Sequence, residues 1–395
     1  MGVLDDTTVV DFTQLMAGGW TTQKLGDMGA DVIKIERPGG DVQRQMGYQG
    51  KFIDGEGIGF LAMNRNKRSV AVDLKTDEGH EVARRLVEEA DVMVQNYRPG
   101  VMERLGFDYE TVAELNPGIV YVSVSAYGSD GPYAERPGQD LLYQAATGLA
   151  SYTGRAGEPP TPAGTVVVDE HTATLAALRT MEALYHRLKT GEGQKVEMSL
   201  FDAAIDMQVN EITFTVNTDS HLDRGEKTHG HPYLSAPYGI FEAADGYVAI
   251  GYSPLPQVAD ALGLDELHEY DDADQPTLFE ERDHVHDVIE AHTSEVPCEE
   301  LVDTLVEADV QAATVEPPEA VPDHPQAQHN GMIVDVDHPR GGSFETTGIP
   351  GRLSETDGEI RRRPPALAEH TDEVLAELGY SDEEIGDLRE RGAVE

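Results

Sequence analysis

The sequence TTVVDFTQLMAGGWTTQKLGDMGADVIKIE, residues 7–36, contains the pattern that decides the fold. Two short runs rich in β-branched residues, Thr7–Asp11 and Asp31–Glu36, flank a longer helical pattern at Gly19–Met28. Short strands that alternate with longer helices are typical of a parallel sheet whose strands are joined by crossover helices. Residues 7–36 therefore predict one strand–helix–strand unit of such a sheet.

The same alternation continues through the first 200 residues of the chain. Further strands are predicted at Ser69–Asp73, Asp91–Gln95, Ile119–Ser125, Gly164–Val168 and Lys195–Ser199. Further helices are predicted at Asp77–Glu89, Tyr109–Leu115, Asp140–Leu149 and His171–Lys189. Turn clusters at Asn116–Gly118 and Thr190–Gly193 separate helix from strand. We therefore predict an α/β fold in which residues 1–217 form a large Rossmann-like domain.

The pattern changes in the second half of the chain. Two strands joined at Ala243–Gly246 are predicted within Tyr238–Gly251, and they indicate a small α+β domain over residues 225–325. Helices of that domain are predicted at Leu255–Leu262, Arg282–Glu295 and Cys298–Ala308. Residues 326–395 are expected to begin as an extended, proline-bearing connector and to return to the large domain. Helices at Thr371–Leu378 and Asp382–Arg391 are predicted to end it.

The charge balance is strongly acidic, with 74 Asp and Glu against 29 Lys and Arg and a formal net charge of −45. The acids are spread along the chain, which predicts a halophilic protein whose self-repulsion is screened by concentrated salt. So negative a chain is not expected to bind nucleic acid or anionic lipid. The sequence shows no signal-peptide pattern and no run near the ~18 apolar residues of a membrane span, so a cytoplasmic location is expected.

Common catalytic motifs are absent from the sequence. It contains neither the G-x-x-x-x-G-K-[ST] phosphate loop nor the G-x-S-x-G nucleophile elbow. The pairs His229 with His231 and His284 with His286 lack the H-E-x-x-H spacing of a zinc hydrolase. Cys298 is the single cysteine, so no internal disulfide is expected. We therefore predict no metal site and no tightly bound cofactor.

Positive charge gathers at three places. Lys34–Asp41 follows a predicted strand, and ligands bind at the carboxyl ends of strands in open α/β sheets. Asn64–Arg68 is a basic cluster, and Asn96–Gly100 with Arg104 forms another. In a chain that otherwise avoids positive charge, such clusters favour phosphate binding. The alternative is ion pairing with the surrounding acids.

Asp169 lies where a predicted strand, Gly164–Val168, runs into a predicted helix. A carboxylate at that junction is typical of a helix N-cap, which accepts hydrogen bonds from first-turn N–H groups. The residue pattern alone favours this structural role over a catalytic one.

Blocks of sequence in a fixed order, from Val9 to about Val394, resemble the family III CoA-transferases. The blocks are Asp11–Gln14 with Ala17 and Gly18, Gly29–Glu36, Asn64–Ser69, Asn96–Gly100 through Gly106, Thr190–Gln194, Glu369–Thr371 and Leu378–Tyr380. The resemblance implies an interlocked homodimer, in which CoA lies across the large domain near the small domain of the partner. It also implies coenzyme A as substrate.

The resemblance gives roles to single residues. Asp169 matches the family's catalytic aspartate, which implies a nucleophile that forms an aspartyl-CoA intermediate. The implied CoA-binding residues are Arg37, Asn96 and Arg104, with Lys67, Arg68 and Arg98 from the same basic blocks. Gln139 stands where the related α-methylacyl-CoA racemases carry a proton-abstracting histidine. Because glutamine does not titrate, transfer is favoured over 2-methylacyl-CoA racemisation, which stays the alternative.

The implied reaction moves CoA from an acyl-CoA to a carboxylic acid. The resemblance implies a short dicarboxylate pair such as succinyl-CoA and mesaconate. The oxalate and formate pair is disfavoured, because Gly251–Pro254 departs from the glycine-rich loop of formyl-CoA transferase. Candidate residues for the acyl part are Asp140, His229, Tyr233 and Tyr238. Packing at a domain junction is the alternative for the last three. A CoA-ester binding protein without catalysis is disfavoured, because Asp169 is present.

Overall fold

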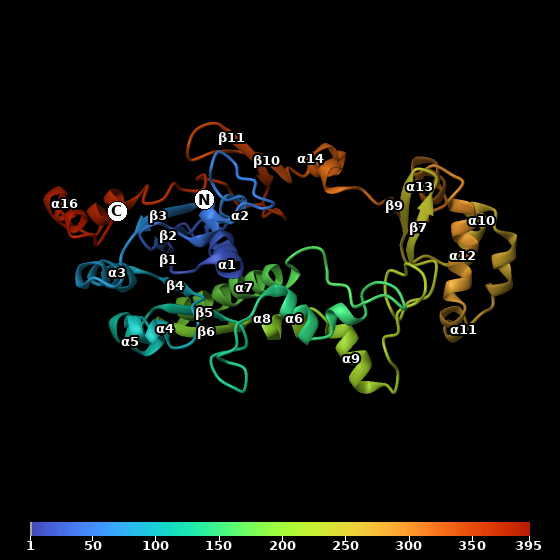
Figure 1. Ribbon diagram of the computed structural model, residues 1–395, viewed down its shortest axis with the longest axis horizontal. Helices are drawn as coiled ribbons and strands as arrows, with labels where there is room; N and C mark the ends of the chain where they lie inside the picture. Colours follow the sequence, from blue (N-terminus) through green and yellow to red (C-terminus); the bar gives the residue numbers. More distant parts are fainter. Residues whose placement is uncertain (1) are drawn as a thin grey trace. The chain divides into compact units, whose positions relative to one another are not determined.

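The computed structural model describes residues 2–395. These residues form two compact units (Figure 1). Unit 1 contains residues 2–143, 166–207 and 325–395, and unit 2 contains residues 144–165 and 208–324. No helix within residues 2–395 combines the length and the apolar character needed to span a membrane.

Unit 1 is built on a six-stranded sheet in the order β3-β2-β1-β4-β5-β6, and every neighbouring pair is parallel (Figure 1). The strands are β1 (Thr8–Asp11), β2 (Asp31–Glu36), β3 (Lys67–Ala71), β4 (Val92–Gln95), β5 (Val120–Ser125) and β6 (Gln194–Ser199). This is the strand order of the Rossmann fold, in which ligands bind where the order reverses, here between β1 and β4. The predicted α/β class with a parallel sheet is confirmed.

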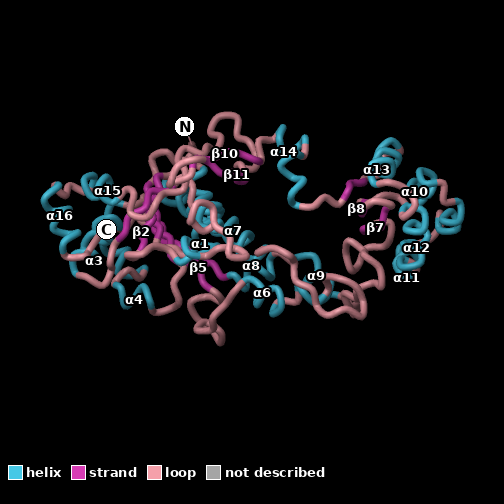
Figure 2. The backbone as a smooth tube through the Cα atoms, turned by 45° about the horizontal axis from the view of Figure 1, so that its top comes forward, coloured by secondary structure: helices cyan, strands magenta, loops and turns pink. Residues whose placement is uncertain are grey.

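Alternate side chains of the strands enter two separate cores. Val9 and Val32 pack with α1 (Leu15–Asp27) and α7 (Val167–Thr190) on one face. Val10 and Ile33 pack on the other face with α3 (Asp77–Glu89), α15 (Thr371–Glu377) and α16 (Asp382–Glu390). Because both faces of the sheet are covered, successive residues of a strand are all buried. This explains why the strands appear in the sequence as continuous apolar runs. Figure 2 shows α15 and α16 close to α3, so the C-terminal helices complete the second face.

The helices of unit 1 begin and end as follows. They are α1 (Leu15–Asp27), α2 (Ile58–Met63), α3 (Asp77–Glu89), α4 (Val101–Leu105), α5 (Tyr109–Leu115), α7 (Val167–Thr190), α8 (Leu200–Asp206), α14 (Pro325–His329), α15 (Thr371–Glu377) and α16 (Asp382–Glu390), while α6 (Asp140–Ala146) begins in this unit. The strand Asp31–Glu36 and the helix Asp77–Glu89 lie where the sequence predicts them. The expected connector near residue 326 also contains a hairpin, β10 (Ile333–Asp337) with β11 (Ser343–Thr347), that the sequence did not reveal.

Several predicted boundaries are wrong, and three of them bear on function. The helix expected from Gly19 begins at Leu15. The strand expected at Gly164–Val168 is absent, because α7 already begins at Val167. The strand expected from Ser69 begins at Lys67, so Lys67 and Arg68 belong to the sheet.

Unit 2 contains a three-stranded antiparallel sheet in the order β7-β8-β9. Its elements are α9 (Val209–Asn217), β7 (Gly239–Ala243), β8 (Gly246–Ile250), α10 (Leu255–Leu262), α11 (Gln275–Glu280), α12 (Arg282–Thr293), α13 (Cys298–Glu307) and β9 (Ala312–Thr314). A separate core formed by the sheet with α10, α12 and α13 holds this unit together.

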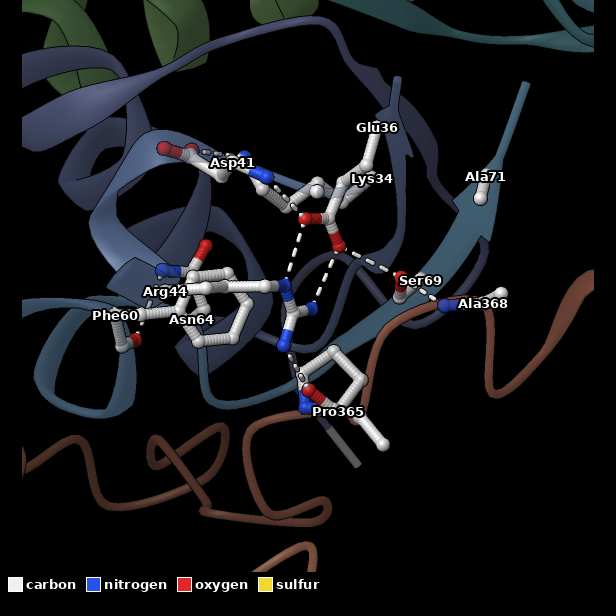
Figure 3. A network of polar contacts seen from close by, with 12 residues as sticks. Lys34, Glu36, Asp41, Arg44, Phe60, Asn64, Ser69, Ala71, Pro365 and Ala368 are labelled. Carbon is white, nitrogen blue, oxygen red and sulfur yellow. Dashed lines mark hydrogen bonds and ion pairs between the residues drawn. The ribbon is translucent and has the colours of Figure 1, made fainter. Parts of the chain in front are cut away.

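A buried arginine ties the C-terminal segment to the sheet (Figure 3). Arg44 pairs with Glu36 at 2.7 Å and donates to the carbonyl of Pro365 at 3.1 Å. Ser69 donates to the same Glu36 carboxylate at 2.7 Å and accepts the N–H of Ala368 at 3.0 Å. The segment that contains Pro365 and Ala368 is therefore anchored to β2 and β3.

Candidate active site

The first turn of α7 is capped from another helix. The carboxylate of Asp140, the first residue of α6, accepts the backbone N–H groups of Val168 at 2.7 Å and Asp169 at 3.1 Å. Val166 precedes α7, and its side chain has no atom able to accept these bonds. The N-cap role predicted for Asp169 is therefore wrong, because Asp140 performs it.

The Asp169 carboxyl group lies between the first turns of two helices. Asp169 is the third residue of α7, and the backbone N–H of Ala17, in the first turn of α1, favours the ionised form of its carboxyl group. Burial and the negative charge of Asp140 raise the pKa of Asp169 to about 7, and the Ala17 hydrogen bond acts in the opposite direction. A carboxylate that is poorly solvated and near two helix N-termini is a good candidate for chemistry.

The turn before α1 is tightly held at the edge of the sheet. Gln14 donates its N–H to Asn96 Oδ1 at 2.8 Å, and Asn96 Nδ2 donates to the Gln14 carbonyl at 2.6 Å. Asn96 directly follows β4 and Gln14 follows β1, so this pair spans the point where the strand order reverses. Leu15 has a φ of +60°, a conformation that costs a non-glycine residue roughly 1–3 kcal/mol and is often found at functional sites.

Gly18 allows this turn to approach the helix. A Cβ atom on Gly18 would lie 2.6 Å from Cβ of Thr13 and 3.0 Å from Cγ of Asn96. A larger residue would therefore push the turn away from α1. The block Ala17-Gly18 resembles the family, but no role for either residue could be predicted from the sequence. In the structure Ala17 lies near Asp169 and Gly18 lies against the turn.

Gln139 is exposed and directly precedes α6, and its carbonyl accepts the N–H of Leu142 at 2.8 Å. Its neighbour Gly138 lies against the buried Tyr143, since a Cβ there would fall 1.5 Å from the Tyr143 hydroxyl oxygen. Burial raises the pKa of Tyr143, and the charge of Asp169 acts in the same direction. Gln139 is thus part of the segment that carries Asp140 to α7.

The predicted CoA-binding residues fall into two groups. Arg37, Arg98 and Arg104 are exposed, and each follows or lies near the carboxyl end of a strand, β2 for the first and β4 for the others. Arg37 Nε donates to the carbonyl of Gly40 at 3.2 Å, so its other guanidinium nitrogen atoms face solvent or ligand. Roles in binding CoA stay predictions for these three residues and for Asn96.

Lys67 and Arg68 form ion pairs inside unit 1. Lys67 is fully buried and lies 3.0 Å from Asp11, while Arg68 pairs with Asp31, Glu373 and Glu377. These two residues therefore follow the ion-pairing alternative and not the predicted CoA binding. The reason is that β3 begins at Lys67, earlier than expected, so both side chains are buried in unit 1.

The candidates for the acyl part lie in unit 2, apart from Asp140. His229 is held by Asp283 at 2.8 Å, and the neighbouring His231 pairs with Glu211 at 2.7 Å. The Tyr233 ring lies 3.9 Å from the His231 ring, and Tyr238 is half-buried. Their part in substrate binding stays a prediction.

Comparison with known proteins identifies relatives along the whole chain. A sequence model of CoA-transferase family III matches residues 4–371. Succinyl-CoA:mesaconate CoA-transferase from Haloarcula hispanica is 37% identical over 392 residues, which cover 96% of this chain and 97% of the relative. Succinyl-CoA:glutarate CoA-transferase from Homo sapiens is 32% identical over 398 residues, or 99% of this chain and 90% of the relative.

The fold also has solved counterparts. The crystal structure of a CAIB/BAIF family protein from Brucella suis superimposes with a TM-score of 0.84 and 32% sequence identity. The match covers 95% of this chain and 99% of that chain.

Proposed function

Because this chain belongs to CoA-transferase family III and is an enzyme that transfers CoA, we propose that the transfer proceeds through a covalent intermediate on Asp169. The observation that carries the proposal is the setting of this carboxylate. Burial and Asp140 raise its pKa to about 7, and the backbone N–H of Ala17 favours its ionised form. Desolvation makes a carboxylate a stronger nucleophile, and the N–H groups of α1 and α7 can stabilise negative charge during transfer.

The proposed reaction conserves the energy of the thioester. An oxygen of Asp169 attacks the carbonyl carbon of the donor thioester, which gives a mixed anhydride and CoA thiolate. The thiolate attacks the Asp169 carbonyl carbon, which releases the donor acid and leaves an aspartyl-CoA thioester. The acceptor carboxylate attacks that carbon and releases thiolate again. The thiolate then attacks the acyl carbonyl of the new anhydride, which forms the product and regenerates Asp169.

A short dicarboxylate pair such as succinyl-CoA and mesaconate is the proposed substrate pair. Support comes from the relatives, two of which are named for succinyl-CoA as a substrate. We assign the binding of the acyl part to Asp140, His229, Tyr233 and Tyr238. Gln139 would hydrogen-bond the substrate or the intermediate.

CoA itself is proposed to bind along the carboxyl ends of the strands. Arg37, Arg98 and Arg104 offer exposed guanidinium groups there, and phosphate groups pair well with arginine. Asn96 holds the α1 turn and would present CoA to Asp169.

We further propose that two chains form an interlocked homodimer. Leu178, Tyr185 and Leu188 lie on α7 with side chains that are 51%, 60% and 82% exposed. An apolar surface of this kind on a strongly charged protein fits contact with a second copy. Sedimentation that shows an active monomer at assay concentrations would contradict this arrangement.

The substrate proposal is tested by a panel of acids. Purified protein is incubated with succinyl-CoA and each acceptor acid, and new CoA esters are detected by mass. We expect a short dicarboxylic acceptor such as mesaconate to give the highest kcat/KM. A preference for oxalate or for monocarboxylic acids would overturn the proposed substrate pair without affecting the role of Asp169.

A further inference from the structure

Three charged side chains from three neighbouring strands meet inside unit 1. Asp11 ends β1, Lys34 lies in β2 and Lys67 begins β3, and all three side chains are at most 1% exposed. Figure 3 shows Lys34 beside Asp41, whose carboxylate lies 3.2 Å from the Lys34 ammonium group. Removing charged groups from water costs about as much free energy as their mutual attraction contributes. A gain in stability therefore does not by itself explain why the cluster is present.

Lys67 uses its three donors on three acceptors. Its ammonium nitrogen lies 3.0 Å from Asp11 Oδ2, 2.8 Å from the carbonyl of Gly19 and 2.9 Å from Oδ1 of Asn64. Gly19 belongs to α1, so Lys67 joins this helix to the end of β1.

The other members of the cluster hold the turn that leads into α1. Asp11 Oδ1 accepts both the N–H and the hydroxyl of Thr13, at 2.8 and 2.6 Å, and Asp11 Oδ2 accepts the Thr22 hydroxyl at 2.7 Å. Lys34 donates to the carbonyl of Thr13 at 2.8 Å. The polar groups of Thr13 are thus fixed by the cluster, two residues before α1 begins.

The held segment is the one that faces the proposed nucleophile. Ala17 lies between Thr13 and Gly19, the two residues that the cluster holds, and it packs against Ala176 and Ala177 of α7. Its backbone N–H also lowers the pKa of Asp169. Movement of this segment by a fraction of an ångström would weaken the Ala17 hydrogen bond, and small misplacements of reacting groups cost rate steeply.

We propose that the buried Asp11–Lys67 pair is a positioning device for the transfer reaction, which holds the first turn of α1 against Asp169. The inference rests on the proposed role of Asp169 as nucleophile. Lys67 is fully buried, and its ammonium group contacts Asp11, Asn64 and the Gly19 carbonyl, so it acts through these groups.

A matched pair of variants separates positioning from stability. Lys67→Met removes the ammonium group at the N-terminal end of α1. Arg65→Met breaks another largely buried ion pair at the other end of the same helix, where Arg65 lies 2.7 Å from Asp27. We expect Lys67→Met to lower kcat on the order of 10²-fold with KM for acyl-CoA little changed. Arg65→Met should leave kcat within about threefold of wild type.

The pH profile gives a readout that loss of stability does not move. Because the Ala17 hydrogen bond lowers the pKa of Asp169, a displaced turn should shift the acid limb of kcat/KM upward by roughly one pH unit in Lys67→Met. The titratable groups that act on Asp169 within the described residues are Asp140 and Tyr143, and neither is changed. If Lys67→Met had a normal kcat and an unshifted acid limb of kcat/KM, the inference would be overturned.

A double variant covers the case in which Lys67→Met does not fold. Asp11→Asn with Lys67→Met leaves no unpaired buried charge, so folding should recover while kcat stays low because the Gly19 carbonyl has lost its donor. Full recovery of kcat would show that the pair serves stability alone. Should the double variant also fail to fold, Thr13→Val, an isosteric change, decides the matter by the same two readouts. If Asp169→Asn kept its activity, the proposed function would fail, whatever Lys67 does.

Discussion

Asp140 and Asp169 are joined by a hydrogen bond in which the carboxylate of the first accepts the backbone N–H of the second at 3.1 Å. The same carboxylate adds a negative charge beside the Asp169 side chain and contributes to its raised pKa. One residue therefore fixes the start of α7 and opposes ionisation of the proposed nucleophile.

Activity is expected to fall below neutral pH, because Asp169 must be ionised to attack. With its pKa at about 7, kcat/KM for acyl-CoA should fall about tenfold per pH unit below that value. Asp140→Asn removes a negative charge and should move this limb to lower pH. Glu170→Gln, on the same turn of α7 but exposed, should leave it in place. An acid limb that Asp140→Asn does not move would contradict the assigned cause.

Asp169→Asn is expected to stabilise the fold above neutral pH. Since the pKa of Asp169 is raised on folding, its contribution favours the folded state at low pH and is lost as pH rises through about 7. The variant lacks this penalty, so its free energy of unfolding at pH 8 should exceed that of wild type by roughly 1–4 kcal/mol, with the gap closing near pH 4. Denaturant titration at both pH values measures the difference. Equal stability at pH 8 would count against a strained carboxylate.

The strong negative charge predicts a requirement for salt. At a formal net charge of −45, self-repulsion should destabilise the fold in dilute buffer, whereas molar KCl reduces the Debye length to ~3 Å. We expect both the melting temperature and the transferase activity to rise with KCl up to the molar range. Full activity with an unchanged melting temperature in dilute buffer would contradict the predicted halophilic character.

Removal of the exposed arginines should weaken CoA binding. Arg37→Ala and Arg104→Ala are each expected to raise KM for acyl-CoA roughly tenfold while kcat changes less, because their contacts are made equally in the ground and transition states. Arg179→Ala serves as the control, since Arg179 pairs with Glu182 on an exposed face of α7. Calorimetric titration with CoA gives an independent affinity. Unchanged affinity in both variants would remove these residues from the CoA site.

Much of the sheet could be predicted from the sequence, because its strands are short β-branched runs with turn residues between them. The run Val166–Val168 is an exception, because it is β-branched but does not form a strand. Its composition favours a strand, but Asp140, 28 residues away from Val168, supplies the cap that lets a helix begin there. No local pattern contains that information.

The basic cluster shows the same limit. Arg68 has its acidic partners Glu373 and Glu377 more than 300 residues away in the sequence, so its ion pairs become visible only in the folded chain. Asp169 could be singled out by its resemblance to the family's nucleophile, whereas its raised pKa depends on Asp140 and on burial. The Ala17 contact likewise depends on how α1 packs beside α7.

The central claim is that Asp169 carries the covalent intermediate, and chemical trapping tests it most directly. Wild-type protein is incubated with donor acyl-CoA and then with hydroxylamine, and its peptides are analysed by mass. We expect a hydroxamate on Asp169 alone and none on Asp169→Asn. The transfer rate of that variant should be lowered by at least ~10³-fold despite normal CoA binding. A label on another residue, or near-normal turnover by Asp169→Asn, would contradict it.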